Sequence, residues 1–271
     1  MREHAPTITL LSDFGLTDEY VGVMKGVIAS TCPQARVVDI THHIARHNVR
    51  QAAFVLNNAF RYFPKGTIHV SVVDPGVGGS RRIVCARVDG HFFLAPDNGL
   101  LTLVVRSGGL ESLHAVTNEA YFLKPVSKTF HGRDIFAPVA ARLGRGEKIE
   151  AFGKRLVLND LCVLDIGEPG ISDDGTLSGE IVWVDHFGNL VTNIDLDVFE
   201  GFVGPPPWDT VTIRLAASQV QGLQSSYEDV EPGRPLALFA SRGLLEICVN
   251  QGDASSYFKA TAGQRVSVIK P

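Results

Sequence analysis

The first half of this 271-residue chain contains short apolar runs that alternate with stretches in which apolar residues recur every three or four positions. The runs are typical of buried strands, and the recurring pattern is typical of helices with one buried face. Strands are expected at 8–11, 36–40 and 67–73, and helices at 20–30 and 49–60. This order of strand, helix, strand, helix and strand favours a parallel, doubly wound sheet with right-handed crossovers.

Both helices carry signals at their ends. Thr17 or Asp18 is expected to cap the first helix, and Asn48 is expected to cap the second, because short polar side chains accept hydrogen bonds from the first free backbone N–H groups. On the first helix, the stripe expected to face the core consists of Tyr20, Val23, Met24, Val27 and Ile28.

After Ile83 the pattern becomes strand-like. Segments 83–88, 91–94 and 100–105 are apolar and separated by turn residues, with Asp89-Gly90 expected to form a hairpin turn. One further helix is expected at 135–143, closed by Gly144. Residues 1–166 are therefore expected to form an N-terminal α/β domain.

The last third of the chain has a different character. Residues 167–179 are dense in glycine, proline and aspartate, as in an interdomain linker or a long surface loop. Residues 180–271 contain short β-branched runs between turn residues, which favours a smaller all-β barrel or sandwich. These strands are expected at 180–184, 190–194, 210–215, 235–239, 244–249 and 266–269.

Composition narrows the class of protein. The chain is 45% hydrophobic and 20% charged, with a net charge of −4 and a pI near 6.1, which argues against nucleic acid as the main partner. Its four cysteines are scattered without a C-x-x-C pair, as in proteins of reducing compartments. No secretory leader and no membrane-spanning run of about 18 apolar residues is found, so a cytoplasmic location is expected.

The most distinctive stretch is V-V-D-P-G-V-G-G-S-R-R, at residues 72–82. A strand ends at Asp74, a glycine-rich loop follows, and Arg81 comes seven positions after the carboxylate. This arrangement is typical of functional loops in α/β proteins, although an ordinary turn with a solvated ion pair gives the same pattern. The G-K-[ST] ending of a phosphate-binding loop is absent.

Histidines offer two further candidates. His42, His43 and His47 suggest a metal site by their spacing, but the glutamate of the zinc-hydrolase motif is missing. His131 precedes a predicted helix, where an imidazole can face a pocket and titrate near neutral pH. A lone histidine in this context is more often structural than catalytic.

Seven motifs in order then resemble one known family. They are S-D-F-G, V-V-D-P-G-V-G-x-x-R-R, A-P-D-N-G-L-L, T-F-H-G-R-D-I-F-A-P, D-x-F-G-N-L-x-T-N-I, S-R-G and N-Q-G. Together they resemble the S-adenosylmethionine hydroxide adenosyltransferases, also called S-adenosyl-L-methionine hydrolases, which are related to fluorinating and chlorinating enzymes. The resemblance implies an N-terminal α/β domain, a C-terminal β-barrel, and a homotrimer that binds substrate at its subunit interfaces.

The resemblance also implies a catalytic triad of Asp74, Arg81 and His131. In the halogenating relatives, tyrosines stand at the first and last of these positions, a serine stands at Gly132, and a threonine that helps to hold halide stands at Val77. The halide pocket is therefore expected to be missing, which favours water as the nucleophile. A tryptophan beside the ribose in those relatives falls at His47.

The remaining site residues come from the same matching. The resemblance implies that Asp13 contacts the ribose and that Phe130 packs on the substrate. It implies that Phe187 and Asn189 contact the adenine, with Asn250 close by. It also implies that Asp185 pairs with the methionine ammonium, and that Ser241 and Arg242 pair with the methionine carboxylate.

The expected reaction is attack of water on the ribose C5′ of S-adenosyl-L-methionine, giving adenosine and L-methionine. The sulfonium leaves as a neutral thioether, so no general acid is needed on that side. No cofactor is expected, because no metal-ligand cluster is convincing and side chains must therefore activate the water. His131 is the preferred proton acceptor because an unperturbed imidazole titrates closest to the working pH, with Asp74 as the open alternative. Three other functions remain to be tested: a halogenase, a non-catalytic adenosyl-binding protein, and a metal hydrolase that uses His42, His43 and His47.

Overall fold

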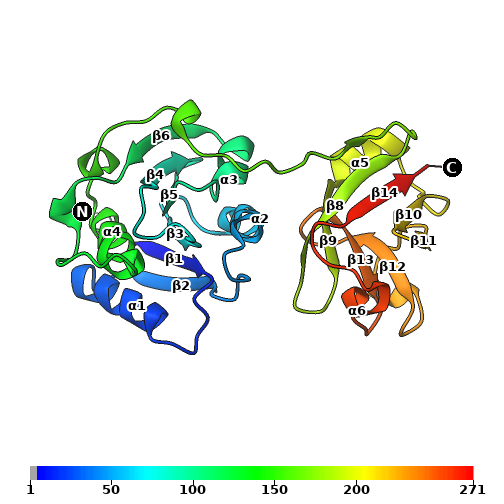
Figure 1. Ribbon diagram of the computed structural model, residues 1–271, viewed down its shortest axis with the longest axis horizontal. Helices are drawn as coiled ribbons and strands as arrows, with labels where there is room; N and C mark the ends of the chain where they lie inside the picture. Colours follow the sequence, from blue (N-terminus) through cyan, green and yellow to red (C-terminus); the bar gives the residue numbers. More distant parts are fainter. Residues whose placement is uncertain (1–4, 271) are drawn as a thin grey trace. The chain divides into compact units, whose positions relative to one another are not determined.

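The structure of the protein is a computed structural model that describes residues 5–270 (Figure 1). These residues form two compact units that divide between Asp165 and Ile166. Residues 1–4, on which the expectation about a secretory leader partly depends, lie outside the described residues. None of the helices formed by residues 5–270 combines the length and apolar character needed to cross a membrane.

The first unit is built on a mostly parallel sheet of six strands in the order β2-β1-β3-β5-β4-β6. Strand β1 pairs in parallel with β2 and β3, and β3 pairs in parallel with β5. Strand β4 runs antiparallel to both β5 and β6. The strands are β1 (Thr7–Ser12), β2 (Arg36–Thr41), β3 (Ile68–Val72), β4 (Ile83–Val88), β5 (His91–Pro96) and β6 (Leu110–Ala115).

Helices cover both faces of this sheet (Figure 1). Helices α1 (Tyr20–Thr31) and α4 (Ala137–Gly144) pack over one apolar cluster, and α2 (Val49–Ala59) and α3 (Thr102–Ser107) pack over another. The doubly wound α/β architecture expected from the sequence is thereby confirmed. The shorter helical turns are η1 (Phe60–Tyr62), η2 (Glu119–Tyr121), the π-helical turn η3 (Gly132–Phe136), η4 (Ile149–Phe152) and η5 (Leu158–Asp160).

Some local predictions for the first unit are confirmed and others are wrong. The Asn48 side chain accepts a hydrogen bond from the Gln51 N–H and caps α2, as expected. Helix α1 is instead preceded by Glu19, without a side-chain cap. Segment 100–105 was expected to be a strand, but it forms most of α3, because a short apolar run has no periodicity that distinguishes the two.

The second unit is a nearly closed, barrel-like antiparallel sheet, as the sequence predicted, with the strand order β11-β10-β14-β8-β9-β13-β12. Its core is the apolar cluster formed by Ile181, Phe199 and Ile247 with their neighbours. The strands are β7 (Gly170–Ile171), β8 (Leu177–Val184), β9 (Leu190–Asp195), β10 (Thr212–Leu215), β11 (Ser218–Gln221), β12 (Pro235–Phe239), β13 (Leu244–Val249) and β14 (Arg265–Ile269).

The second unit differs from the sequence-based expectation in detail. It contains two short helices, α5 (Leu196–Val203) and α6 (Ala254–Phe258), and one helical turn, η6 (Tyr227–Asp229). Part of the segment expected to be linker is strand, because β7 pairs with the start of β8 at Leu177. The glycines and aspartates of this segment therefore form a hairpin turn of the sheet rather than a free connection.

Candidate active site

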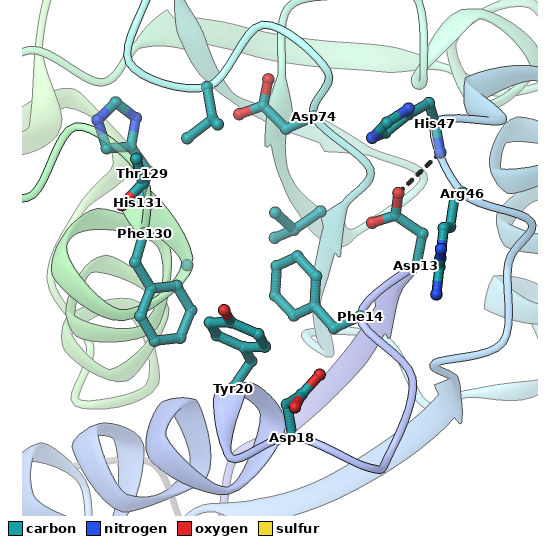
Figure 2. Close-up of a pocket in the computed structure, with 13 residues that line it drawn as sticks. Asp13, Phe14, Asp18, Tyr20, Arg46, His47, Asp74, Thr129, Phe130 and His131 are labelled. Carbon is teal, nitrogen blue, oxygen red and sulfur yellow. Dashed lines mark hydrogen bonds between the residues drawn. The ribbon is translucent and has the colours of Figure 1, made fainter.

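The candidate site of the first unit lies at the carboxyl ends of two neighbouring parallel strands. Asp13 follows β1 directly, and Asp74 lies two residues beyond the end of β3. Because β1 and β3 pair in parallel, their carboxyl ends meet at one edge of the sheet, where α/β proteins commonly bind ligands. Figure 2 shows both carboxylates beside one cavity.

This cavity has a volume of about 430 Å³. It is lined by Asp13, Phe14, Asp18, Tyr20, Arg46, His47, Val72, Asp74, Val77, Thr129, Phe130, His131 and Gly132. Its aromatic wall is a cluster of Phe14, Tyr20 and Phe130, in which the Tyr20 and Phe130 ring centres are 5.0 Å apart and nearly perpendicular. The expectation that Tyr20 belongs to the buried stripe of α1 is wrong: its side chain is 41% exposed and faces the cavity.

Asp74, Arg81 and His131 meet in one hydrogen-bonded chain. Arg81 donates from Nε to both carboxylate oxygens of Asp74, at 3.0 and 2.9 Å, and also from Nη2. The same Nη2 lies 2.7 Å from Nδ1 of His131. Asp74 and His131 line the cavity. Arg81, which bonds to both, is not part of the lining, and its side chain is only 13% exposed.

This geometry determines the protonation of His131. A guanidinium can only donate, so Nδ1 of His131 accepts, and a neutral ring then carries its proton on Nε2. Burial lowers the pKa of His131 below its ordinary value of 6.5, and the charge of Arg81 lowers it further, against opposing effects of Asp74 and Asp134. Electrostatics and hydrogen bonding therefore both favour a neutral imidazole.

The glycine-rich loop after Asp74 allows Arg81 to reach His131. Gly78 has a φ of +76°, which glycine adopts at little cost. A Cβ at this position would lie 2.1 Å from the carbonyl oxygen of Lys128, three residues before His131. The loop therefore packs directly against the backbone of the segment that carries the histidine.

The ribose contact expected for Asp13 involves a carboxylate that is already partly engaged. Its Oδ2 accepts a hydrogen bond of 2.9 Å from the His47 N–H, shown in Figure 2. His47 has a left-handed backbone with a φ of +64°, a conformation that costs a non-glycine residue energy. Its imidazole lines the same cavity.

His42, His43 and His47 do not form a joint metal site. The ring of His42 is buried and bonds through Nδ1 to the Ser12 hydroxyl at 2.7 Å, while His43 is exposed. Within residues 5–270, no group of three or more histidine, cysteine, aspartate or glutamate side chains is arranged to hold a metal ion.

In the second unit, Asp185 and Asn189 form one hydrogen-bonded turn between β8 and β9. Asp185 Oδ1 accepts from the backbone N–H groups of Phe187 at 2.9 Å and Asn189 at 3.0 Å. Asn189 Nδ2 donates to Asp185 Oδ2 at 3.3 Å and to the Tyr227 hydroxyl at 3.4 Å. The D-H-F-G-N motif is thus both a tight turn and a fixed set of polar groups.

Arg242 lies near this turn. Ser241, the residue directly before Arg242, is exposed between β12 and β13. One guanidinium nitrogen of Arg242 lies 3.8 Å from Asp185 and 2.9 Å from Glu246, and the group stacks on Trp183. Burial raises the pKa of the Glu246 carboxyl, with an opposing effect of Arg242. The residue expected to meet the methionine carboxylate therefore already has acidic partners.

A second cavity, of about 400 Å³, lies in this unit. Phe187 and Asn189 line it, and Phe187 is 74% exposed. Asn250 does not line it: its side chain donates to the Val230 carbonyl at 2.7 Å, although its neighbour Gln251 does line the cavity.

Sequence analysis missed several residues at both cavities. Tyr20 was assigned to the core because it begins an amphipathic helix, and its nearness to S-D-F-G was the signal that could have corrected this. Arg46, Asp18 and Tyr227 belong to no motif, and only the fold brings them to the cavities.

The chain belongs to the SAM hydroxide adenosyltransferase family. The model of the family's N-terminal domain matches residues 8–153, and the model of its C-terminal domain matches residues 179–267. The resemblance stated from the motifs is thereby confirmed.

Individual relatives agree with this assignment. The chain is similar to the (R)-S-adenosyl-L-methionine hydrolases of Salinispora tropica (36% identity, 97% of both chains) and Thermus thermophilus (34%, 97% of this chain and 99% of the relative). It is 28% identical to the fluorinase of Nocardia brasiliensis, over 97% of this chain and 96% of the relative. It also resembles the crystal structure of a conserved Thermotoga maritima protein, with a TM-score of 0.90 at 38% identity over 97% and 100% of the chains.

Proposed function

We propose that this protein hydrolyses S-adenosyl-L-methionine to adenosine and L-methionine. The observation that carries the proposal is the chain of hydrogen bonds from Asp74 through Arg81 to His131, with its two outer members facing one cavity. Relatives that match nearly the full chain are named as hydrolases of this substrate, which supports the same reaction here.

The reaction forms a bond between a water oxygen and the ribose C5′ and breaks the bond between C5′ and sulfur. The bonding pair stays on sulfur, which becomes the neutral thioether of methionine, so no acid is needed on that side. The protein's task is to hold one water molecule in line with the breaking bond, since correct positioning alone removes much of a barrier. The carboxylate of Asp74 and the N–H of a neutral His131 supply one acceptor and one donor for that water.

We assign the departing proton to Asp74 rather than to His131. The Nδ1 of His131 already accepts from Arg81, so it gains a proton only after that bond breaks. Asp74 Oδ1 accepts one hydrogen bond from Arg81, through Nε, and so keeps a further lone pair for the proton. As the new bond to carbon forms, the attacking water becomes strongly acidic, so a weak base such as a carboxylate suffices.

Asp13 and the aromatic wall of the first cavity are proposed to hold the adenosyl ribose, with Phe130 packing on the substrate. The adenine is proposed to meet Phe187 and Asn189, near Asn250, and the methionine end is proposed to meet Asp185, Ser241 and Arg242. In the family, as the resemblance implies, these two sets of residues come from the N-terminal domain of one subunit and the C-terminal domain of its neighbour. We therefore propose, with the family, a homotrimer whose sites form between subunits, and we expect sedimentation equilibrium to give three times the monomer mass of 29.3 kDa.

We further propose that the enzyme works in the cytoplasm. We also propose that it needs no cofactor, because the side chains of Asp74 and His131 suffice to hold the water. A halogenase is the competing function suggested by the fluorinase relatives. Val77 lines the cavity where those relatives place a halide-binding threonine, and its side chain offers no hydrogen-bond donor.

Incubation with S-adenosyl-L-methionine in ¹⁸O-labelled water tests the proposal. The expected result is adenosine with one heavy oxygen at the 5′ position. Chloride-dependent formation of 5′-chloro-5′-deoxyadenosine would instead establish the halogenase. A tight complex without product would leave a non-catalytic adenosyl-binding protein, and activity lost on chelation and restored by a metal ion would establish a metal hydrolase.

A further inference from the structure

The loop that carries Asp74 and Arg81 is held at both ends by a single turn. This turn, Asp97-Asn98, directly follows β5 in the A-P-D-N-G segment and lies outside the lining of the first cavity. Asp97 is buried, with 3% of its side chain exposed. A buried carboxylate is costly unless its oxygens are bonded, so its partners indicate what it is for.

One end of the loop is held by Asn98. Its Nδ2 donates a 2.8 Å hydrogen bond to the carbonyl oxygen of Val73, the residue directly before Asp74. Its Oδ1 accepts from the Leu100 N–H at 3.3 Å, which fixes the orientation of the amide. The carbonyl of a fully buried residue at the end of a strand is thus bonded by a side chain that does not belong to the sheet.

The other end is held by Asp97. Its N–H donates to the carbonyl oxygen of Arg82, the residue directly after Arg81, at 2.9 Å. Its Oδ2 accepts from the Arg82 Nε at 2.8 Å, and its Oδ1 accepts from the Cys162 N–H at 2.8 Å. Arg82 is held further by a hydrogen bond to the Asp160 carbonyl.

Between these ends, the hydrogen bonds of the loop backbone are internal. The Val77 N–H donates to the Asp74 carbonyl, and the Gly79 N–H donates to the Gly76 carbonyl. A glycine-rich loop of this kind has many accessible conformations, so its end points decide where Asp74 and Arg81 lie.

We infer that Asp97 and Asn98 are positioning residues for the hydrolysis, acting through Val73 and Arg82 to set the distance between Asp74, Arg81 and His131. This inference rests on the proposed function for its kinetic consequence, but its structural consequence can be measured without substrate. Loss of the Asn98 bond frees the backbone before Asp74 and weakens the Arg81 bond to His131.

Asn118 provides a matched control. Its Nδ2 donates to the Ala151 carbonyl at 2.9 Å and its Oδ1 accepts from the Ala120 N–H at 3.2 Å, so it makes the same two bonds as Asn98 in the same unit. It lies outside the lining of the first cavity. Asn118→Ala therefore removes the same two kinds of bond, at a more exposed position, without freeing the loop.

The experiment compares Asn98→Ala and Asn118→Ala in kcat, KM and the ¹⁵N shifts of ¹⁵N-histidine-labelled protein, with the His131 signal assigned from His131→Gln. Asn98→Ala is expected to lower kcat about 10- to 100-fold with KM changed less than about threefold, because a displacement of about 1 Å suffices for such losses. It is also expected to shift the His131 signal. Asn118→Ala is expected to leave both unchanged.

Asn98→Ala with unaltered kcat and an unaltered His131 signal overturns the inference, as does an equal effect of both variants. If Asn98→Ala does not fold by circular dichroism, Asp97→Asn takes its place, because it keeps an oxygen for the Cys162 N–H and weakens the bond to Arg82. If the wild-type protein lacks hydrolase activity, the proposed function fails, and the His131 signal still decides whether the turn positions the triad.

Discussion

At the scale of single residues, His131 has more than one possible role, and its hydrogen bond to Arg81 selects one. The sequence favoured His131 as a proton acceptor because imidazole titrates near neutral pH. The structure gives its Nδ1 a permanent donor and a lower pKa, which suits a neutral ring that donates from Nε2. Once the contact between His131 and Arg81 is known, His131 is better suited to donate a hydrogen bond than to accept the proton.

This arrangement predicts the pH dependence of the reaction. Because the neutral form of His131 is the one that accepts from Arg81, activity is complete above the pKa of His131 and is lost as the pH falls through it. Burial and Arg81 lower this pKa, so the acid limb of kcat/KM is expected below pH 6.5. A pH–rate profile measures it, and an acid limb at or above 6.5 contradicts the prediction. In Arg81→Gln, histidine NMR is expected to show a higher pKa for His131.

Substitutions of the two cavity carboxylates are expected to affect different kinetic parameters. Asp74→Asn removes the proton acceptor and is expected to lower kcat at least about 100-fold with little change in KM. Asp13→Ala removes a ligand contact and is expected to raise KM, with a smaller effect on kcat. Steady-state kinetics distinguish the two, and equal changes in both parameters for both variants contradict the assigned roles.

At the scale of elements, the glycine-rich loop and the segment before η3 depend on one close backbone contact. The resemblance implied that these segments bring Asp74, Arg81 and His131 together in one triad, but the sequence did not show that their backbones touch at Gly78. Gly78 is the point of contact, since any side chain there meets the Lys128 carbonyl. The loop is therefore shaped both by the conformational freedom of glycine and by the absence of a Cβ.

Gly78→Ala is expected to separate Arg81 from His131. A Cβ placed 2.1 Å from the Lys128 oxygen forces the two segments apart, so kcat is expected to fall at least about tenfold. Gly66→Ala is the control, because Gly66 has a similar φ of +85° but nothing within 4 Å of its Cβ position. Both variants bear the cost of a left-handed alanine, about 1–2 kcal/mol. Equal activity of the two variants contradicts the prediction.

At the scale of the whole molecule, the core of the first unit contains a pair of contacting histidines, His69 and His91, that take no part in the candidate site. His69 is fully buried in β3, with its Nδ1 2.8 Å from the Thr9 hydroxyl and its Nε2 3.2 Å from Nδ1 of His91. Aromatic rings of Phe60, Phe63 and Phe93 surround it. A charged imidazole is unfavourable there, so the stability of this unit depends on pH.

Burial, with a smaller effect of His91, lowers the pKa of His69 from 6.5 to about 3. The unfolded chain therefore binds more protons between these values, and the free energy of unfolding falls as pH drops from about 6.5 to about 3, by up to ~1.4 kcal/mol per pH unit. His69→Gln is expected to reduce this slope. His43→Gln, at an exposed histidine, is expected to leave it unchanged.

Denaturant unfolding at several pH values measures the slope for each unit. The helical circular dichroism signal mainly follows the first unit, which contains the longest helices, α1 and α2. Fluorescence follows the second unit, because both tryptophans, Trp183 and Trp208, lie there. A slope from circular dichroism that is the same in His69→Gln and in the wild type contradicts the prediction.

The sequence by itself determined the fold class, the positions of most strands along the chain and the family. These follow from signals that can be read along the chain: apolar periodicity, turn residues such as Asp89-Gly90, and the order of the seven motifs. Sequence-based prediction failed at segment 100–105, which suits either a strand or a helix, and at Tyr20, which suits either the core or a cavity wall. Only tertiary packing decides between these alternatives.

Only the tertiary structure decided how the site works. Asp74, Arg81 and His131 were named as a group through resemblance, but the bond that engages Nδ1 of His131 depends on two segments 50 residues apart coming within 2.7 Å. The bonds from Asp97 and Asn98 to the ends of the loop are equally non-local. Hydrogen bonds act over about 3 Å in space whatever the separation along the chain, and local sequence patterns carry no record of them.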